Sequence, residues 1–133
     1  MGAGPLHRLP DGLGAAVGAE SLLVNGLIKS AFRRTRPLWE GERPLRVRRP
    51  RTSSFPSGHS SSAFSAAVLL SDDDALWPLY YAVAAIVASS RVYVKMHHAS
   101  DVVAGAALGV GLGLLWRRLA PLPPLDGPAG PTA

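Results

Sequence analysis

Four apolar segments that carry almost no charge make up most of this chain of 133 residues. They cover residues 12–32, 60–71, 75–90 and 98–118, and polar or proline-rich stretches separate them. Segments of this length and composition are typical of helices that are buried on most sides, in a protein core or in a lipid bilayer. The sequence therefore predicts an all-α bundle of about four helices, small enough to form a single domain.

The segments fit a membrane-embedded bundle better than a soluble one, although no uncharged run reaches the roughly 18–20 residues of a full span. In the last segment Gly105, Gly109 and Gly113 follow one another at four-residue steps, which predicts a smooth face for close helix packing. Aromatic residues near the segment ends suit the two membrane interfaces: Trp39, Trp77, Tyr80, Tyr81, Tyr93 and Trp116. We expect a multi-pass protein of a bacterial cell membrane, with a soluble bundle as the alternative.

The charge of the chain is concentrated in one loop. The net charge is +5, and nine of the 14 basic residues lie between Lys29 and Arg51. This stretch holds three prolines and few aromatic residues, so it does not resemble a nucleic-acid-binding surface, and we expect no nucleic-acid partner. Only 17% of the residues are charged, which argues against a disordered chain. The absence of cysteine excludes disulfides, thiolate nucleophiles and Cys-based zinc sites.

Two blocks of residues at the ends of these segments could hold an anion. Lys29 and Arg36 are seven residues apart, about two helical turns, so both are expected on one face at the end of the first helix. The second block reads Pro56-Ser57-Gly58-His59, where Gly58 lets the backbone approach an anion at the start of the second helix.

The third block contains a histidine and a carboxylate with helical spacing. It begins at Ser90-Arg91 and continues through His97 to Asp101. On a helical start a carboxylate four residues after a histidine can reach the imidazole, fix its tautomer and leave the other ring nitrogen free to attack.

Together the three blocks resemble the type 2 phosphatidic acid phosphatase (PAP2) superfamily, which includes bacterial acid phosphatases and vanadium haloperoxidases. The family pattern is Lys, six residues, Arg-Pro; then Pro-Ser-Gly-His; then Ser-Arg, five residues, His, three residues, Asp. All eleven fixed positions match here in the same order. The resemblance covers residues 29–101 and implies the helical core of that family.

The resemblance implies a phosphate-binding site. Lys29, Arg36 and Arg91 would bind the phosphoryl oxygens, and Ser57 and the Gly58 amide would add hydrogen bonds. Three cations around one site suit a group with two or more negative charges, and an arginine can bind it through two N–H groups.

It also implies a catalytic set. His97 would be the nucleophile and form a phosphohistidine, Asp101 would orient it, and His59 would protonate the leaving oxygen and then activate water. No metal and no cofactor is expected, because the basic residues would stabilise the charge that Mg²⁺ stabilises elsewhere.

Other polar residues are expected to be structural. His98 is out of register with Asp101 and is interpreted as a packing residue, Glu20 as facing the bundle interior or solvent, and residues 72–74 as a polar turn rather than a metal site. A solvated or lipid-headgroup surface is the expected role of the remaining loop arginines: Arg33, Arg34, Arg43, Arg46, Arg48, Arg49 and Arg51.

The expected function is a membrane phosphatase that acts on a lipid phosphate or diphosphate, with a polyprenyl carrier lipid as the favoured substrate. A vanadate-dependent haloperoxidase and a non-catalytic, phosphate-binding remnant are the alternatives.

We expect a flexible stretch over residues 1–11, the phosphatase domain over 12–118 and a disordered Pro-rich tail over 119–133. Only 28 residues precede Lys29, so amino-terminal helices usual in the family are expected to be missing, and a homo-oligomer could supply the lost packing.

Overall fold

The computed structural model describes residues 5–38, 48, 50–72 and 74–120, with side chains from residue 12 onward. These residues form four helical rods and no strand, which confirms the all-α prediction. The first rod joins three consecutive elements, and its middle part is a π-helical stretch. The elements are α1 (Pro5–Leu22), η1 (Leu23–Ile28), α2 (Lys29–Ala31), α3 (Gly58–Leu70), α4 (Trp77–Tyr93) and α5 (Ala99–Leu119).

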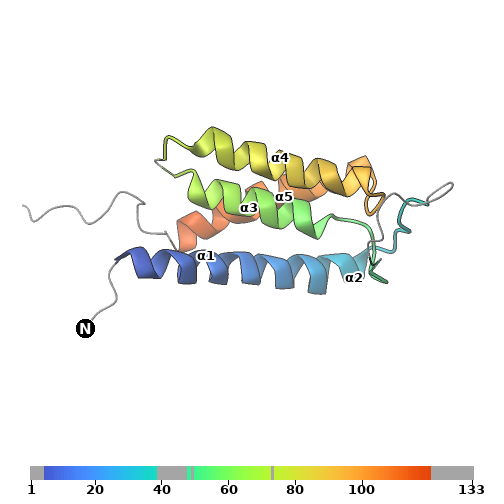
Figure 1. Cartoon of the computed structure of the whole chain (residues 1–133). Coiled ribbons are helices and arrows are strands. Elements are labelled where there is room, and N and C mark those ends of the chain that lie inside the picture. The colour runs from blue at the N-terminus through green and yellow to red at the C-terminus, as the bar shows by residue number, and fades with distance from the viewer. Residues whose placement is uncertain (1–4, 39–47, 49, 73, 121–133) are drawn as a thin grey trace, which may run out of the picture.

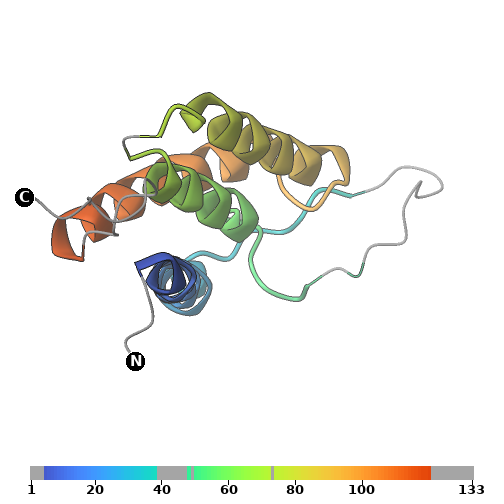
Figure 2. The ribbon, with the colours of Figure 1, turned by 60° about the vertical axis from the view of Figure 1, so that its left-hand side comes forward.

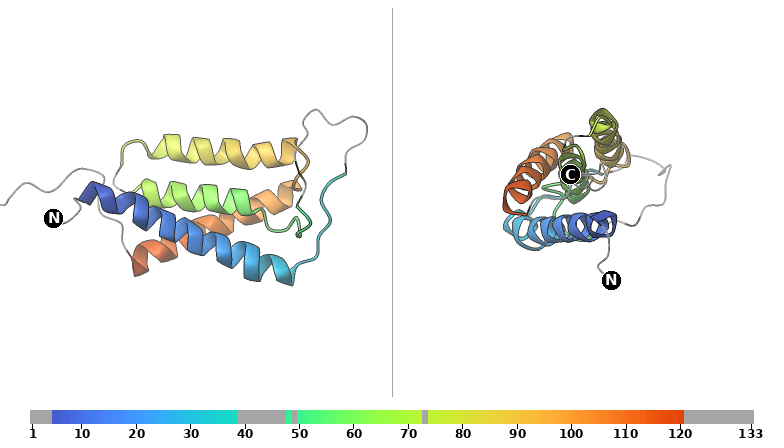
Figure 3. Two further views of the ribbon diagram at one scale, coloured as in Figure 1. Left: turned by 60° about the horizontal axis from the view of Figure 1, so that its bottom comes forward. Right: turned by 90° about the vertical axis from the view of Figure 1, so that its left-hand side faces the viewer.

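Helix α3 is the centre of the bundle. It packs most extensively against α5, then against α4 and α1. The end-on view shows α1, α4 and α5 placed around it (Figure 3). The long axes of α1, α3 and α4 run roughly side by side in Figure 1, and Figure 2 shows α3 beside α4 with α1 seen nearly end-on. A helix surrounded on three sides can bury small and polar residues along most of its length, and α3 buries Ser60, Ser61 and Ser65 together with its apolar residues.

The predicted glycine face of α5 is confirmed. A methyl group added at Gly105 would overlap the carbonyl oxygen of Ser57, and one at Gly109 would overlap that of Ser61. At Gly113 an added Cβ would lie 3.0 Å from the Val68 side chain. The glycines therefore allow the backbone of α5 to approach the backbone of α3 directly, which is the packing expected from their four-residue spacing.

Several helix boundaries differ from the prediction. The first helix begins at Pro5 rather than near residue 12, because proline fits the first position of a helix, where its missing N–H is not needed. Helix α4 continues past Arg91 to Tyr93, and a basic residue in the last turn is favourable at the negative end of a helix dipole. Leu119, predicted in the tail, is the last residue of α5, while the rest of that tail (121–133) and residues 39–47 lie outside the described residues.

Glu20 faces the bundle interior, one of the two places expected for it. It is 5% exposed, and its carboxylate accepts hydrogen bonds from the hydroxyls of Ser61 and Ser62 on α3. This pairing compensates for the loss of hydration and links α1 to α3.

The acidic turn before α4 has structural partners. Asp72 forms an ion pair with Arg117 of α5, and Asp74 accepts hydrogen bonds from the Leu76 amide and the Tyr80 hydroxyl. Among the described residues no group of three or more acidic or histidine side chains is placed to hold a metal ion.

Candidate active site

The three sequence blocks meet at one end of the bundle, where α2 ends, α3 begins and a short turn joins α4 to α5 (Figure 1). A backbone hydrogen bond from the Ser57 amide to the Asp101 carbonyl, 2.9 Å long, joins the second block to the third. Each block lies where a helix begins or ends, so the conformation of that helix end sets the distances between its residues.

The turn after α4 sets the distance between Arg91 and His97. Lys95 adopts a left-handed conformation (φ 54°), its amide donates to the Val92 carbonyl, and the Met96 amide donates to the Arg91 carbonyl. This is the Schellman arrangement that ends many helices. It reverses the chain so that the His97 amide also donates to the Arg91 carbonyl, at 3.2 Å.

His97 is held through one ring nitrogen by a backbone carbonyl. Its Nδ1 lies 2.6 Å from the carbonyl oxygen of Ser54, and its side chain is 3% exposed. A carbonyl can only accept, so Nδ1 carries the proton and Nε2 holds the lone pair in the neutral ring. Nε2 lies 3.4 Å from Nη1 of Arg36, a donor, which agrees with this tautomer. The unprotonated nitrogen therefore points toward a cation.

Asp101 does not make the hydrogen bond to His97 that its spacing predicted. The closest approach, between Nδ1 and Oδ2, is 4.0 Å. Oδ2 instead accepts the His98 amide at 2.7 Å in the first turn of α5, and Oδ1 accepts Nη1 of Arg34 at 2.9 Å. A buried carboxylate in the first turn of a helix satisfies the exposed amides there, which accounts for the difference. Its function in catalysis stays a prediction.

Two loop segments, residues 34–36 and 52–54, lie beside His97 and are hydrogen-bonded to each other. The Ser54 amide donates to the Arg34 carbonyl at 3.0 Å, and the Ser54 hydroxyl donates to the Thr35 carbonyl at 3.3 Å. Arg36 links these two segments to the turn between α4 and α5. Its Nη1 donates to the Met96 carbonyl at 2.7 Å, and its Nη2 donates to the carbonyl and the hydroxyl of Thr52. The carbonyl that holds His97 is thus itself fixed in place.

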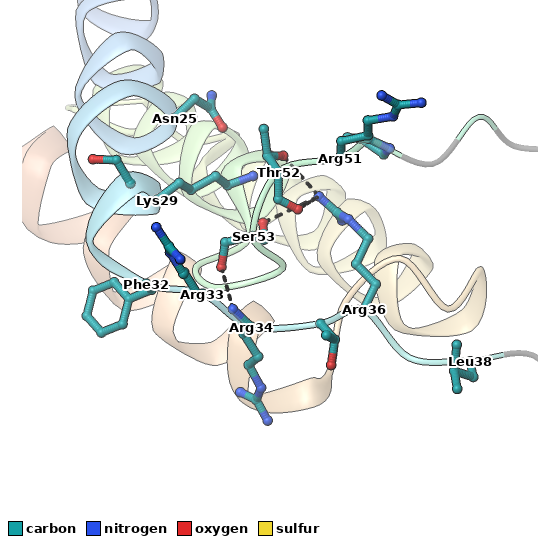
Figure 4. A pocket seen from close by; sticks show the side chains of 13 residues that line it. Asn25, Lys29, Phe32, Arg33, Arg34, Arg36, Leu38, Arg51, Thr52 and Ser53 are labelled. Atoms are coloured by element: carbon teal, nitrogen blue, oxygen red, sulfur yellow. Dashed lines mark hydrogen bonds between the residues drawn. The ribbon is translucent and has the colours of Figure 1, made fainter.

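Lys29 and Arg36 share one region, but not one helical face. The helix ends at Ala31, and Phe32 is already extended, so the expected two-turn spacing does not apply. The residue before a proline disfavours the helical conformation, which explains why the helix does not continue through Arg36 to Pro37. The extended segment nevertheless brings Arg36 back beside the buried Lys29, and both line the same cavity (Figure 4).

Ser57 and Gly58 lie at the start of α3, as predicted. The Ser57 hydroxyl accepts the Ser60 amide at 3.3 Å and so caps the helix, and the residue is fully buried. Gly58 packs closely against η1: a Cβ there would lie 2.8 Å from Oδ1 of Asn25. The contact of the Gly58 amide with an anion stays a prediction.

His59 is exposed in the first turn of α3. Partial burial, and after it the positive charges of Arg91, Lys29 and Arg36, lower the pKa of its imidazole. Both predicted catalytic histidines and all three predicted phosphate-binding cations lie at the same end of the bundle. The role of each residue in catalysis stays a prediction.

Three contributors to the site were not predicted. Ser54 contributes its backbone carbonyl, and because every residue has one, the sequence gives no signal for it. Arg34 was assigned to a solvated surface, but it pairs with Asp101 and also donates to the Ser100 hydroxyl at 2.7 Å. Asn25 lines the same cavity as Lys29. It lies one helical turn before Lys29, and this spacing could have placed it in the site from the sequence.

The chain is similar to known proteins. Residues 12–122 match the PAP2 superfamily. The chain is 37% identical over 110 residues to a decaprenylphosphoryl-5-phosphoribose phosphatase of Mycobacterium tuberculosis, an alignment that covers 80% of this chain and 58% of that protein. It is 40% identical over 68 residues to a lipid A 1-phosphatase of Porphyromonas gingivalis, covering 47% of this chain and 15% of the relative.

A solved structure is also similar. The transmembrane PAP2-type phosphatidylglycerolphosphate phosphatase of Bacillus subtilis superposes with a TM-score of 0.55 at 28% identity, over 80% of this chain and 56% of that one. The chain thus spans little more than half the length of these two longer relatives. The match over residues 12–122, with all eleven motif positions inside it, establishes that the chain belongs to the PAP2 superfamily.

Proposed function

We propose that this chain is a phosphatase that hydrolyses a lipid phosphate through a phosphohistidine on His97. One observation carries the proposal: Nδ1 of His97 is bound to the Ser54 carbonyl, while Nε2 carries the lone pair and lies 3.4 Å from Nη1 of Arg36. A neutral, oriented imidazole next to a cation is what a nucleophilic attack on a phosphate requires. The relatives support a lipid substrate, since their names refer to a decaprenyl lipid and to lipid A.

The proposed reaction has two steps. Nε2 of His97 attacks the phosphorus, the bond to the lipid oxygen breaks, and His59 donates a proton to the departing oxygen. Water then attacks the phosphohistidine, His59 takes its proton, the P–N bond breaks, and inorganic phosphate leaves. Lys29, Arg36 and Arg91 stabilise the charge on the phosphoryl oxygens in both steps, so the residues suffice without a metal ion.

A membrane location is part of the proposal. Among the described helices α5 alone is both long enough and apolar enough to cross a bilayer. Large apolar side chains are nevertheless exposed along one stripe of α4, at Leu79 (56%), Val83 (52%) and Ile86 (69%). Such a stripe on the outside of a bundle favours contact with lipid or with another protein. A multi-pass arrangement and a homo-oligomer both remain predictions.

The test of the proposed function is phosphate release from a panel of lipid phosphates in non-ionic detergent. We expect release in the presence of EDTA, and inhibition by vanadate, because vanadate can take the geometry of the five-coordinate phosphorus at His97. Release that depends strictly on Mg²⁺ would contradict the metal-independent mechanism. Folded protein that binds phosphate but releases none from any lipid would favour the non-catalytic alternative, and vanadate-dependent halide oxidation would favour a haloperoxidase.

His97 is expected to stay neutral well below pH 6. Burial lowers the pKa of its imidazole to about 4, although the hydrogen bond to the Ser54 carbonyl acts in the opposite direction. Because the unfolded chain binds this proton more readily, the contribution of His97 to stability falls as the pH drops from the ordinary imidazole value of about 6.5 toward 4. NMR titration of ¹³C-labelled histidine, with His97→Gln to assign the signal, should give a midpoint near pH 4. A midpoint between 6 and 7 would contradict the buried, neutral state.

A further inference from the structure

The backbone of Arg34 is bound to the loop segment that holds His97. Its amide donates to the Ser53 hydroxyl at 3.1 Å, and its carbonyl accepts the Ser54 amide at 3.0 Å. The carbonyl of the same Ser54 lies 2.6 Å from Nδ1 of His97. Ser54 is thus the link between Arg34 and the nucleophilic ring, and a displacement of Arg34 would reach the ring through it.

The side chain of Arg34 is bound to the first turn of α5. Its Nη1 donates to Oδ1 of Asp101 at 2.9 Å and to the Ser100 hydroxyl at 2.7 Å. The guanidinium is 41% exposed, whereas the Asp101 side chain is fully buried. Figure 4 shows the Arg34 side chain extending away from Lys29, while the backbone amide bonds to Ser53. A charge-assisted hydrogen bond to a carboxylate is stronger than a neutral one, so this contact holds Arg34 firmly against α5.

Asp101 already has two partners other than the catalytic ring. Oδ1 accepts Arg34 and Oδ2 accepts the His98 amide, while Nδ1 of His97 lies 4.0 Å from Oδ2. The family resemblance assigned the orientation of His97 to Asp101, but the atom that bonds to the ring is the Ser54 carbonyl. The path of contacts from Asp101 to the ring therefore runs through Arg34 and Ser54.

We propose that Arg34 is a positioning residue that fixes the tautomer and the orientation of the His97 ring. By joining Asp101 to Ser54, it keeps the Ser54 carbonyl opposite Nδ1, so that Nδ1 carries the proton and Nε2 carries the lone pair. Arg34 acts through Ser54 rather than on the phosphate. This inference rests on the proposed function, in which Nε2 of His97 attacks the phosphorus.

The first experiment measures the tautomer of His97 directly, from the ¹⁵N shifts of its two ring nitrogens. At neutral pH the ring is uncharged, because burial lowers its pKa to about 4. Protein labelled with ¹⁵N-histidine is studied in detergent micelles, with His97→Gln to assign the signal. We expect the proton on Nδ1 in the wild type and a mixture of both tautomers in Arg34→Gln. Arg48→Gln is the matched control, because it removes an exposed arginine from the same loop and should leave the wild-type signal.

Several results of this measurement would overturn the proposal. They are a proton on Nε2 in the wild type, an unchanged tautomer in folded Arg34→Gln, and the same change in Arg48→Gln. Arg34→Lys covers the case in which Arg34→Gln does not fold, because it keeps a cation beside the buried carboxylate. Lysine cannot reproduce the rigid guanidinium geometry, so a smaller proportion of the second tautomer is expected there, and none would contradict the inference.

The second experiment separates positioning from binding. With short-chain phosphatidic acid, or the best substrate of the panel above, we expect kcat to fall roughly tenfold or more in Arg34→Gln, because a misplaced nucleophile slows the chemical step. KM should stay within about threefold of the wild type, and Arg34→Lys should recover part of kcat. A higher KM with unchanged kcat would show that Arg34 binds the substrate, and an equal loss in Arg48→Gln would show a general effect of charge; either result overturns the proposal. If the wild type releases phosphate from no lipid, the proposed function fails, while the tautomer measurement still decides the role of Arg34.

Discussion

Replacement of His97 by alanine should abolish phosphate release, by a factor on the order of 10⁴ or more, as expected for loss of a covalent nucleophile. No phosphoenzyme should form, because the ring nitrogen that would carry the phosphate is gone. The measurement is trapping of phosphoenzyme from a ³²P-labelled substrate by rapid denaturation at alkaline pH, with circular dichroism to confirm that the helices persist.

The smaller variant His97→Gly gives a readout that misfolding cannot imitate. The space left by the ring can admit free imidazole, which should restore part of the activity and yield phosphoimidazole as the product. Full retention of phosphoenzyme in His97→Ala would show that another residue is the nucleophile.

The second histidine should behave differently. His59→Ala removes the proposed acid, but a substrate with a good leaving group, such as p-nitrophenyl phosphate, needs no proton at that oxygen. We therefore expect one equivalent of p-nitrophenol and a phosphoenzyme that hydrolyses slowly. Equal loss of the first and second steps in both histidine variants would contradict the division of roles between His97 and His59.

The position of this site could be predicted from the sequence because its three motifs lie at the ends of helices. The spacing from Arg91 to His97 follows from the turn that ends α4, and Ser57 caps the first turn of α3 just before Gly58. Each of these features depends on residues within a few positions of one another. Local hydrogen bonds of this kind can be inferred from a pattern of residue types.

The remaining parts of the site depend on contacts between distant segments. Arg34 is 67 residues from Asp101, and nothing in a run of basic residues singles out the one that will pair with a buried carboxylate. The acceptor for His97 is a backbone atom of Ser54, and every residue has such an atom. The helical face proposed for Lys29 and Arg36 was wrong, because the helix ends between them. Tertiary packing decided these features, as it often does where local preference is weak.

The largest effect on stability is expected where α5 crosses α3. Gly109→Ala adds a methyl group that would overlap the carbonyl oxygen of Ser61, a backbone atom that cannot turn aside as a side chain can. The two helices must then separate. Overpacking of this kind costs about 1–3 kcal/mol. Because α5 begins at Ala99 and carries Asp101, and α3 carries His59, a shift between these helices also displaces the active site, so we expect activity to fall with stability.

Gly111 provides the matched control, since it lies on the same helix and a Cβ there meets nothing within 4 Å. Alanine is the better helix former by about 1 kcal/mol, so Gly111→Ala should be neutral or stabilising. Unfolding of both variants in mixed detergent micelles, followed by circular dichroism, measures the difference. The same chemical change is thus expected to act in opposite directions two residues apart, which only the contact with α3 can explain. If Gly109→Ala unfolds at or above the wild-type midpoint, the backbone contact between α3 and α5 is wrong, and with it the position of Asp101 relative to His59.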